Sequence, residues 1–498
     1  MTTPAPPERP STPQPTPPGP GTGRLESLRA VIGSAVAIVA NFGVALSVAD
    51  KSTTLAGIFF STTAIVTIAG NSTALGAMTG LTYHLPDDLR RPDPNPRSLL
   101  VIALGPVLAA STAAGLLIVV AAGPIAAVVA SAHRADVAVM LGIMGIAVPC
   151  RALTLAALGA TRGLGSMLPT VSVHQIIVPV GQLAGLALVL RRSGEPAPSA
   201  IALAWLLPIV VGLVLTMAAV RHLGGLRTSD RATVTAGEFW SYTRPRGVSA
   251  AYQIALERLD VILVSAVVGE AAAGVYGTLG RFVSAGNYLV FAMSQAMAAP
   301  LRGAVVAGRL QQAKRLLDLS TSWMVLVAVP YLLLLALKAE VIVEFINPDL
   351  VTGATALAVA SVLVTANPLA GPVDMTLLML GRSRSSMRIT AWAVLINVSV
   401  AWVGLHYVGL VGAAVAWGVA VIVQNAAAVV IIRRHSELRP FGRAGRTAAV
   451  GAVVAVGPVA LATPDTVAGV VISGLVAAVV LAGWTVLHAD RFGLRRRS

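Results

Sequence analysis

The residues best placed to do chemistry are three charged side chains inside one apolar run. Glu257, Arg258 and Asp260 lie at the centre of the apolar segment 248–268. At 100° per residue, an α-helix places Glu257 and Asp260 about 60° apart on one face, with Arg258 turned away from both. A charge at the centre of a bilayer costs about 2.5–3.5 kcal/mol or more, so these groups face a partner helix or a watery cavity. There they could bind a charged ligand or carry a coupling cation; the alternative is a buried interhelical ion pair that only fixes packing.

Arg281 is a second cationic side chain at the same predicted depth. It lies in the next apolar segment, and Arg258 and Arg281 are equally far along the chain from the turn between the two segments. At 1.5 Å per residue, both lie about 17 Å from the outer helix ends, close to the bilayer midplane. Two guanidinium groups at one depth on adjacent helices predict an anion site suited to phosphate. The alternative is that Arg281 pairs with Asp260 or Glu257, and a resting pair that opens to admit a phosphate would satisfy both interpretations.

Other polar side chains inside apolar segments are further candidates. Asn41, Asn71 and Gln182 lie within predicted spans of the first half, where they could line a hydrophilic cavity. Arg151 and Asp374 lie closer to predicted cytoplasmic helix ends, so we interpret them as side chains that reach the membrane surface. The first half therefore offers mainly neutral polar groups to a central site, whereas the second half carries the charges.

These residues must be positioned by a membrane protein, because the composition excludes other classes. Of 498 residues, 56% are apolar and only 11% are charged, and the mean hydropathy is +0.81. Soluble domains average about 25% charged residues, so a soluble enzyme, a nucleic-acid-binding domain and a disordered scaffold are excluded. An outer-membrane barrel is excluded too, because its strands alternate in short segments. The net charge of +15 does not indicate nucleic acid, since the basic residues lie between the apolar runs.

Fourteen apolar segments follow a Pro-rich tail, and a bilayer-spanning helix needs about 20 such residues. The tail, residues 1–22, has nine prolines and lacks the basic start and apolar core of a signal peptide, so we expect it to be disordered. We place the spans at 27–48, 53–79, 98–122, 136–158, 168–190, 199–222, 248–268, 271–299, 319–345, 351–380, 387–408, 411–433, 445–463 and 466–488.

The distribution of Lys and Arg predicts the orientation. If the N-terminus is cytoplasmic, 28 of the 36 basic residues lie in the two tails, in the even-numbered connections or at the helix ends next to them, and five lie in or near the odd-numbered connections. The positive-inside rule therefore places both termini in the cytoplasm and requires an even number of spans. We expect a multi-pass protein of the bacterial plasma membrane.

Short sequence echoes indicate an internal repeat. Ala-Gly-Ile-Phe at 56–59 recurs as Ala-Gly-Val-Tyr at 273–276, and Ala-Gly-Asn at 69–71 recurs at 285–287. Because this offset corresponds to six helices, an even number, the halves would be parallel repeats with a ligand site between them. The predicted fold is an all-α polytopic membrane protein of about 14 transmembrane helices, with two parallel six-helix repeats plus two C-terminal helices. Its expected divisions are a tail at 1–22, a first lobe at 23–222, a cytoplasmic linker at 223–247, a second lobe at 248–433, helices 13 and 14 at 434–490, and a basic tail at 491–498.

The sequence lacks the motifs of common catalytic sites. It contains no metal-ligand cluster, Walker loop, nucleophile elbow or paired-His motif, so we expect no metal and no cofactor. The single cysteine, Cys150, lies in an apolar run, and we interpret it as a small buried hydrophobe. The outer connections are too short to hold a catalytic domain, which argues against an enzyme such as a membrane glycosyltransferase or polymer ligase.

Four stretches together resemble a known family. The stretch ERLDVILVSAVVGEAAAGVYGTLGRF at 257–282 has an Arg-x-Asp, a short turn and a Gly-Val-Tyr, and the stretch at 379–420 has Asn397 followed by a Gly-rich turn. AGIFF at 56–60 and LGATRGLGSM at 158–167 are their counterparts in the first half. With these motifs the chain resembles the polysaccharide (lipid-linked oligosaccharide) flippases of the multidrug/oligosaccharidyl-lipid/polysaccharide exporter (MOP) superfamily.

The resemblance implies two six-helix lobes around a central cavity and a substrate of the polyprenyl-diphosphate-linked oligosaccharide type. Such a flippase moves its substrate to the outer leaflet by alternating access for cell-surface polysaccharide biosynthesis. Arg258 and Arg281 match the cationic cavity residues associated with the diphosphate. The implied partners are this lipid-linked substrate and the phospholipid bilayer, together with a polysaccharide polymerase or glycosyltransferases.

Two departures bear on the branch of the superfamily. The chain lacks the Arg-Asp element that lipid II flippases have near the first helix, and it lacks the acidic coupling residue that drug exporters commonly have there. Both absences favour the polysaccharide branch. The alternative is a proton- or sodium-coupled exporter of drugs or other small molecules, in which Glu257 and Asp260 would be the coupling pair.

Overall fold

The computed structural model describes residues 22–130, 132–191, 195–228, 234–492 and 494, and the regular elements in these residues are helices. Apart from residue 22, the Pro-rich tail expected at 1–22 lies outside the described residues, as does most of the basic tail expected at 491–498. Helices are the form that long apolar segments take in lipid, because each backbone N–H and C=O must be bonded within its own segment.

The first half of the described chain is a run of α-helices that one π-helix interrupts. Its elements are α1 (Thr22–Lys51), α2 (Thr53–Thr73), α3 (Ala77–Leu89), α4 (Pro96–Val120), α5 (Ala122–Val129), α6 (Arg134–Met144), α7 (Ala147–Gly163), the π-helix η1 (Thr170–Ile177), α8 (Val178–Leu190) and α9 (Pro198–His222).

The second half begins with the two longest helices and ends with a hairpin. Its elements are α10 (Ala236–Val267), α11 (Glu270–Val306), α12 (Leu310–Leu337), α13 (Ala339–Ile346), the 3-10 helix η2 (Pro348–Gly353), α14 (Ala354–Val364), α15 (Ala366–Ala370), α16 (Val373–Met379), α17 (Ser383–Val408), α18 (Leu410–His435), α19 (Arg443–Ala462) and α20 (Val467–Leu487).

The all-α polytopic membrane fold is confirmed, but the expected number of fourteen spans is not. Among the described residues, eleven helical segments are long and apolar enough to cross a membrane, or twelve if the bent pair α6–α7 is one span. The two expected spans that are not among them are α10 and α11. They are 32 and 37 residues long, so length is not the reason. In α10 the reason is the number of charges, because its most apolar stretch holds three charged residues, Glu257, Arg258 and Asp260.

Prolines explain where two of the expected spans are broken. The span expected at 136–158 divides between α6 and α7 with a bend of 41°. Pro149 has no N–H to donate to the carbonyl of Gly145, and the helix ends at that position. Here α4 comes close, since a Cβ added to Gly115 would lie 2.7 Å from the carbonyl oxygen of Gly145. Likewise, Pro368 removes the donor for the carbonyl of Val364, the last residue of α14.

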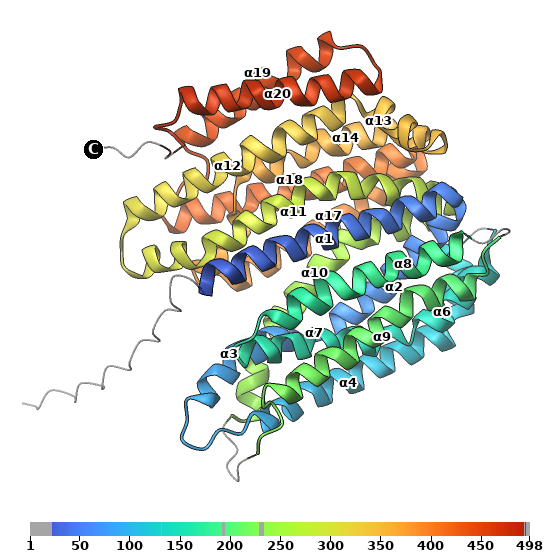
Figure 1. Ribbon diagram of the computed structural model, residues 1–498, viewed down its shortest axis with the longest axis vertical. Coiled ribbons are helices and arrows are strands. Elements are labelled where there is room, and N and C mark those ends of the chain that lie inside the picture. The colour runs from blue at the N-terminus through green and yellow to red at the C-terminus, as the bar shows by residue number, and fades with distance from the viewer. Residues whose placement is uncertain (1–21, 131, 192–194, 229–233, 493, 495–498) are drawn as a thin grey trace, which may run out of the picture.

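The helices form two groups that meet along α2, α10 and α11 (Figure 1). In the first group, α7 packs against α2, α3, α4 and α9, and α1 packs against η1 and α8. In the second, α18 packs against α14 and α17, and α12 packs against α11 and α14. The hairpin α19–α20 lies on the far flank of α12 (Figure 1). Because α1 begins and α20 ends on one side of the molecule, we call that the terminal side and the opposite one the distal side.

The repeated Ala-Gly motifs meet at the contact between α2 and α11. A Cβ added to Gly57 would lie 1.7 Å from the carbonyl oxygen of Glu270, and one added to Gly274 would lie 1.8 Å from that of Thr53. Gly57 and Gly274 are 217 residues apart, and so are Thr53 and Glu270. The contact is therefore reciprocal, as in an isologous interface related by a two-fold axis. Only glycine permits the two backbones to approach so closely.

Helix α10 begins earlier than the sequence indicated. Thr235 and Glu238 form a capping box, in which the Glu238 carboxylate accepts from the Thr235 backbone N–H at 2.9 Å. These hydrogen bonds from Thr235 also lower the pKa of Glu238. Residues 236–247, expected as the end of a linker, are therefore helical. They pack against the first group, because a Cβ added to Gly76 would lie 2.6 Å from the backbone nitrogen of Gly247.

Candidate functional site

The candidate site is built around the charged triplet of α10, at the junction of the two helix groups. Asp260 is buried, with 6% of its surface exposed. Its Oδ2 atom accepts a hydrogen bond of 2.9 Å from the hydroxyl of Tyr276 on α11, and its Oδ1 atom accepts from the backbone N–H of Val261 at 2.8 Å. The carboxylate therefore links α10 to α11 about two helical turns before the end of α10.

Arg258 and Arg281 are cations that form no direct ion pair with a carboxylate of the described residues. Both are half-buried, and within the described part of the chain neither guanidinium makes a hydrogen bond or an ion pair. The buried Nε atom of Arg258 has no partner. Arg258 and Arg281 lie within electrostatic range of each other and of Asp260. The expected alternative, an ion pair between Arg281 and a neighbouring carboxylate, is not formed in this structure.

Arg281 faces the first helix group. Its guanidinium carbon lies 4.9 Å from the centre of the Phe60 ring of α2, a cation–π geometry. The ring is held there by Gly277 of α11, where an added Cβ would lie 2.5 Å from Phe60. Since Phe60 belongs to the motif at 56–60 and Arg281 follows its counterpart, the site lies directly beside the reciprocal glycine contact.

A third arginine, Arg151 of α7, comes from the first helix group. Its Nε atom donates a hydrogen bond of 2.9 Å to Oδ1 of Asn71 on α2, and its stem lies against Gly70, where an added Cβ would be 3.1 Å from Cδ of Arg151. Arg151 also lies within electrostatic range of Arg258. We define Arg151, Arg258 and Arg281 as the arginine cluster.

Sequence reasoning missed Arg151 because it considered only the distance of this residue from a helix end. A usable signal was present. The repeated motif Ala-Gly-Asn at 69–71 contains a glycine, which leaves room for a neighbouring side chain, and an amide oxygen, which can accept a hydrogen bond from a guanidinium group. The pairing of Asn71 with Arg151 also gives this asparagine a definite role within the first group.

Glu257 does not share the environment of Asp260. It is exposed, and its Oε1 atom accepts a hydrogen bond of 3.2 Å from Nε2 of Gln253, one turn earlier on α10. The predicted angle of about 60° between the two carboxylates is therefore enough to place one inside the helix contact and the other at its surface.

The remaining candidates lie apart from the arginine cluster. Asn41 is exposed on α1 and donates to the carbonyl oxygen of Ala37 in its own helix at 2.7 Å. Gln182 is buried and donates to the carbonyl oxygen of Trp205 at 3.2 Å, so it ties α8 to α9. Asp374, which was interpreted as reaching the membrane surface, is exposed and accepts a hydrogen bond from Ser386.

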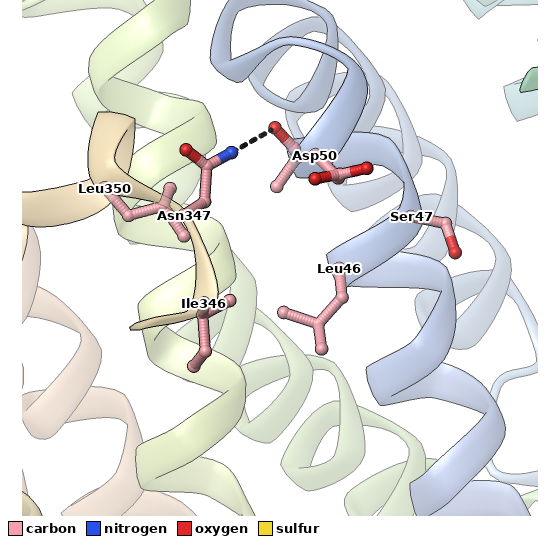
Figure 2. A pocket seen from close by; sticks show the side chains of 7 residues that line it. Leu46, Ser47, Asp50, Ile346, Asn347 and Leu350 are labelled. Carbon is pink, nitrogen blue, oxygen red and sulfur yellow. Dashed lines mark hydrogen bonds between the residues drawn. The ribbon is translucent and has the colours of Figure 1, made fainter. Parts of the chain in front are cut away.

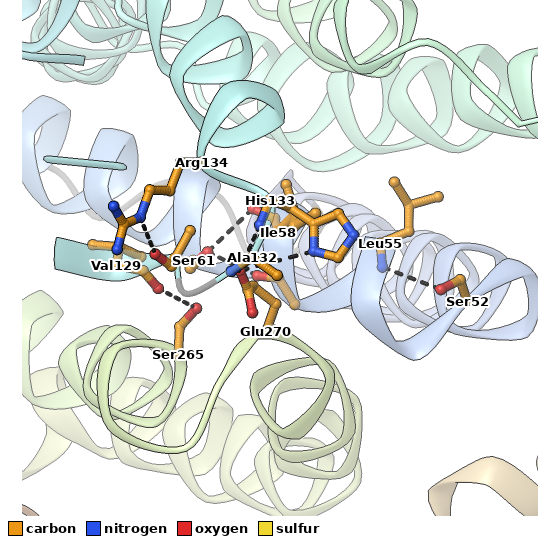
Figure 3. Close-up of polar contacts among 12 residues, drawn as sticks. Ser52, Leu55, Ile58, Ser61, Val129, Ala132, His133, Arg134, Ser265 and Glu270 are labelled. Atoms are coloured by element: carbon orange, nitrogen blue, oxygen red, sulfur yellow. Dashed lines mark hydrogen bonds and ion pairs between the residues drawn. The ribbon is translucent and has the colours of Figure 1, made fainter. Parts of the chain in front are cut away.

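On the distal side, the two helix groups are joined by hydrogen bonds around Glu270 (Figure 3). This buried carboxylate, at the start of α11, accepts from the backbone N–H groups of Ala132 and His133 at 3.0 and 3.1 Å. Beside it, the hydroxyl of Ser265 donates to the carbonyl oxygen of Val129 at 2.9 Å. Sequence reasoning overlooked Glu270 because it lies in a turn rather than inside an apolar segment.

A second distal link joins α1 to the segment between α13 and η2. Nδ2 of Asn347 donates to the carbonyl oxygen of Ala49 at 3.3 Å (Figure 2). A small pocket of about 240 Å³ opens next to this bond, with Asp50 and Leu46 on one wall and Ile346 and Leu350 on the other. The distal face is therefore closed by several separate contacts, with the arginine cluster on the terminal side of them.

The described residues offer no site for a metal ion. No group of three or more His, Cys, Asp or Glu side chains in them has a suitable arrangement. The candidate site presents guanidinium groups next to a buried carboxylate that accepts a hydrogen bond from a tyrosine hydroxyl.

Comparisons with known proteins identify the fold. No family model matches the sequence, and neither does any curated protein. Among solved structures, the chain is similar to an inward-facing multidrug resistance MATE family transporter of the MOP superfamily, with a TM-score of 0.66 and 16% identity over 82% of this chain and 97% of that one. It is also similar to the lipid II flippase MurJ in an inward closed conformation, with a TM-score of 0.70 and 12% identity over 94% and 99%.

A third solved structure, a MATE protein in the bent conformation, has a TM-score of 0.59 and 15% identity over 86% of this chain and 96% of that one. At such identities the likeness establishes the fold alone, and it does so for two kinds of transporter, a multidrug resistance transporter and a lipid II flippase. The chain therefore has the fold that these solved transporter structures share.

Proposed function

We propose that the protein is a membrane transporter that flips polyprenyl-diphosphate-linked oligosaccharides across the bacterial plasma membrane. The observation that carries this proposal is the arginine cluster, in which Arg258 and Arg281 have no hydrogen-bonding partner among the described residues. Keeping an unpaired guanidinium group away from water costs free energy, and an anionic ligand that binds the group would offset this cost. Three guanidinium groups from both helix groups suit a diphosphate, which presents two adjacent phosphates to forked donors.

The mechanism we propose is alternating access. The diphosphate enters from the terminal side, taken to be cytoplasmic from the distribution of Lys and Arg, and binds the arginine cluster while the distal contacts are closed. Its sugars occupy the polar space between the helix groups and its prenyl chain stays in lipid. Neutralisation of the arginine cluster then removes the repulsion between Arg151 of the first helix group and Arg258 of the second. The groups rock about the α2–α11 contact, and the distal contacts at Glu270 and Asn347 open.

Substitution of the two arginines tests the proposal. We expect Arg258→Gln and Arg281→Gln to reduce flipping of a fluorescent polyprenyl diphosphate in proteoliposomes roughly tenfold or more, since each loses charge-assisted hydrogen bonds. Arg281→Lys should retain part of the activity, because the charge remains but the fork is lost. Arg388→Gln, an exposed arginine on α17, is the matched control and should flip at the unaltered rate.

Two results would contradict the anion site. One is unimpaired flipping in both glutamine variants, and the other is an equal loss in Arg388→Gln. A cellular readout is the lipid-linked intermediate, which should accumulate when either glutamine variant replaces the normal protein.

The second candidate function is a cation-coupled exporter of drugs or other small molecules. The observation that favours it is Asp260, a buried carboxylate held by Tyr276 at the junction of the two helix groups. In such an exporter, Asp260 would bind and release the coupling cation. Asp260→Asn should then abolish the dependence of transport on a proton or sodium gradient, whereas Glu257→Gln should leave it intact because Glu257 is exposed. An unchanged gradient dependence in Asp260→Asn would exclude this carboxylate as the carrier.

A further inference from the structure

A second polar cavity lies away from the arginine cluster, on the terminal side of the hairpin α19–α20. It has a volume of about 720 Å³ and opens between α12, the start of α19 and the end of α20. Three arginines line it, Arg443, Arg446 and Arg491, together with His488. Since α19 packs on α12 and α20, this cavity is on the outer flank of the second helix group.

Positive charge exceeds negative charge in the lining of this cavity, where three arginines face two carboxylates, Asp318 and Asp490. The two oxygens of Asp318 accept from the backbone N–H groups of Gly442, Ala444 and Gly445 at 3.0–3.1 Å. That carboxylate therefore satisfies backbone donors in the first turn of α19, and it forms no ion pair with a described arginine. The guanidinium groups of Arg443 and Arg446 make no hydrogen bond or ion pair with a described group, which leaves their donors available to an anion.

The wall of the cavity is fixed in place. Nε1 of Trp484 donates to the carbonyl oxygen of Thr447 at 3.0 Å, and the ring lies so close to Gly451 that an added Cβ there would be 2.5 Å away. Arg491 donates to the hydroxyl of Thr447 at 2.7 Å, and the ring of His488 lies on that of Trp484. A tryptophan with its N–H bonded and its ring at a helix end is typical of the membrane interface.

An apolar surface leads out of the cavity along α20. Val486 and Leu487 next to the cavity are 66% and 80% exposed, and Val479 and Leu475 further along the helix are 72% and 64% exposed. Only 11% of the apolar stretch of α20 is buried within the protein, so hydrocarbon must cover the rest. The cationic cavity and the apolar face thus meet at the depth where a headgroup is joined to its acyl chains.

We propose that this cavity binds an anionic phospholipid, whose phosphate lies against Arg443 and Arg446 and whose acyl chains follow α20. Basic pockets at the ends of spanning helices are suited to acidic headgroups, because a desolvated phosphate and a guanidinium form bidentate, charge-assisted hydrogen bonds. The bound lipid fastens the hairpin to α12 on the terminal side. On the distal side, Lys338 at the end of α12 fastens the hairpin in the same way, because its ammonium donates to Asp465 at 2.7 Å and to the carbonyl oxygen of Thr463 at 2.8 Å.

Lipid retention by the purified full-length protein tests the proposal. We expect native mass spectrometry to show that the protein retains dioleoyl phosphatidylglycerol in preference to the phosphatidylcholine of the same chain length. The double variant Arg443→Gln/Arg446→Gln should bind phosphatidylglycerol about tenfold or more weakly. The matched control Arg433→Gln/Arg434→Gln removes two exposed arginines from the end of α18 on the same side and should bind it normally.

Because Arg443 and Arg446 are exposed, their replacement should leave the fold intact, which circular dichroism and the unfolding temperature in lipid-free detergent will check. Should the double variant fail to purify, Arg446→Gln alone tests the same contact with a smaller expected loss. Equal retention of the two lipids, or an equal loss in the control variant, would overturn the proposal. Full competition of soluble glycerol phosphate with phosphatidylglycerol would also overturn it, because the cavity would then bind a free phosphate. Displacement of phosphatidylglycerol by a polyprenyl diphosphate at equal concentration would overturn it as well, because the cavity would then bind the transported lipid.

Discussion

At the scale of single residues, the site combines a satisfied carboxylate with unsatisfied guanidinium groups. Asp260 has protein partners for both of its oxygens, in Tyr276 and the backbone of Val261. Arg258 and Arg281 have electrostatic neighbours but no hydrogen-bonding partner in the described residues. A structural ion-pair network would show the opposite pattern, with each cation matched to a carboxylate at short distance. The arrangement therefore supports the proposal that an anion brought from outside completes the site.

The Asp260–Tyr276 bond should contribute to stability. Tyr276→Phe removes the hydroxyl and leaves Oδ2 of a buried carboxylate without its donor, which should cost about 1–3 kcal/mol. The expected result is a lower unfolding temperature of the purified protein in detergent. Tyr252→Phe, an exposed tyrosine on the same helix as Asp260, is the control and should unfold like the normal protein.

A double-mutant cycle separates this bond from general packing. If the hydroxyl acts through Asp260, Tyr276→Phe should cost less in an Asp260→Asn background, because the charged acceptor is already absent. Equal costs in the two backgrounds would mean that the hydroxyl stabilises α11 independently of Asp260.

The sequence was sufficient to locate the charged residues but not their partners. The apolar pattern predicts that Glu257, Arg258 and Asp260 lie in a span, and symmetry about the turn predicts that Arg281 lies at the depth of Arg258. Which carboxylate is buried depends on side chains of other helices, such as Tyr276, and periodicity within one helix carries no such information. Arg151 likewise reaches toward α2 only because Gly70 of that helix leaves space for its side chain.

At the scale of helices, the contact between α2 and α11 is the closest approach that joins the two groups. It depends on Gly57 and Gly274, at which even a methyl group would overlap a carbonyl oxygen of the other helix. The sequence showed these glycines as parts of a repeat, and only the packing of the helices shows that the two copies touch. Small residues are the usual means by which helices approach closely in membranes.

A methyl group at this contact should disturb the closed distal face. In Gly57→Ala the added carbon would lie 1.7 Å from the carbonyl oxygen of Glu270, so the helices must separate. We expect transport to fall severalfold or more and cysteines introduced on the distal side of α11 to become more accessible to a water-soluble thiol reagent. Gly280→Ala is the matched control in α11, because nothing lies within 4 Å of a Cβ added there.

Normal transport and unchanged labelling in Gly57→Ala would mean that the α2–α11 contact relaxes at little cost. A fall of the same size in Gly280→Ala would indicate an effect of alanine on the helix itself, unrelated to the contact.

The helix boundaries illustrate the other limit of sequence reasoning. The turn expected between 268 and 271 is confirmed by α10 ending at Val267 and α11 beginning at Glu270. The start of α10 at Ala236 was not expected, since residues 236–247 are too polar to form part of a span. They are held in the helix by the capping box at Thr235 and by packing against α3. Neither a helix cap nor a contact with another helix contributes to the hydropathy of a segment.

At the scale of the whole molecule, the contacts between the two helix groups are distributed unevenly along the membrane normal. Hydrogen bonds between the groups occur on the distal side, at Glu270, Ser265 and Asn347. On the terminal side the first turns of α10 cross to the first group and pack on α3, so this helix belongs partly to both groups. A transporter that rocks about such an arrangement must break the distal hydrogen bonds in every cycle, and α10 must transmit the movement.

Cross-linking the distal side should therefore stop transport in a reversible way. In a Cys150→Ala background, Ala49→Cys and Asn347→Cys place thiols on the two sides of a hydrogen bond of 3.3 Å, within reach of a short bifunctional methanethiosulfonate. The cross-linked protein should lose flipping because the distal contacts cannot open, and reduction should restore it. Lys314→Cys and Glu437→Cys form the matched pair, since they replace an ion pair of 3.0 Å within the second group and their cross-link should leave flipping unchanged. Flipping that persists after complete cross-linking of the distal pair would refute alternating access through that face, because the substrate would then have crossed while the two groups remained joined.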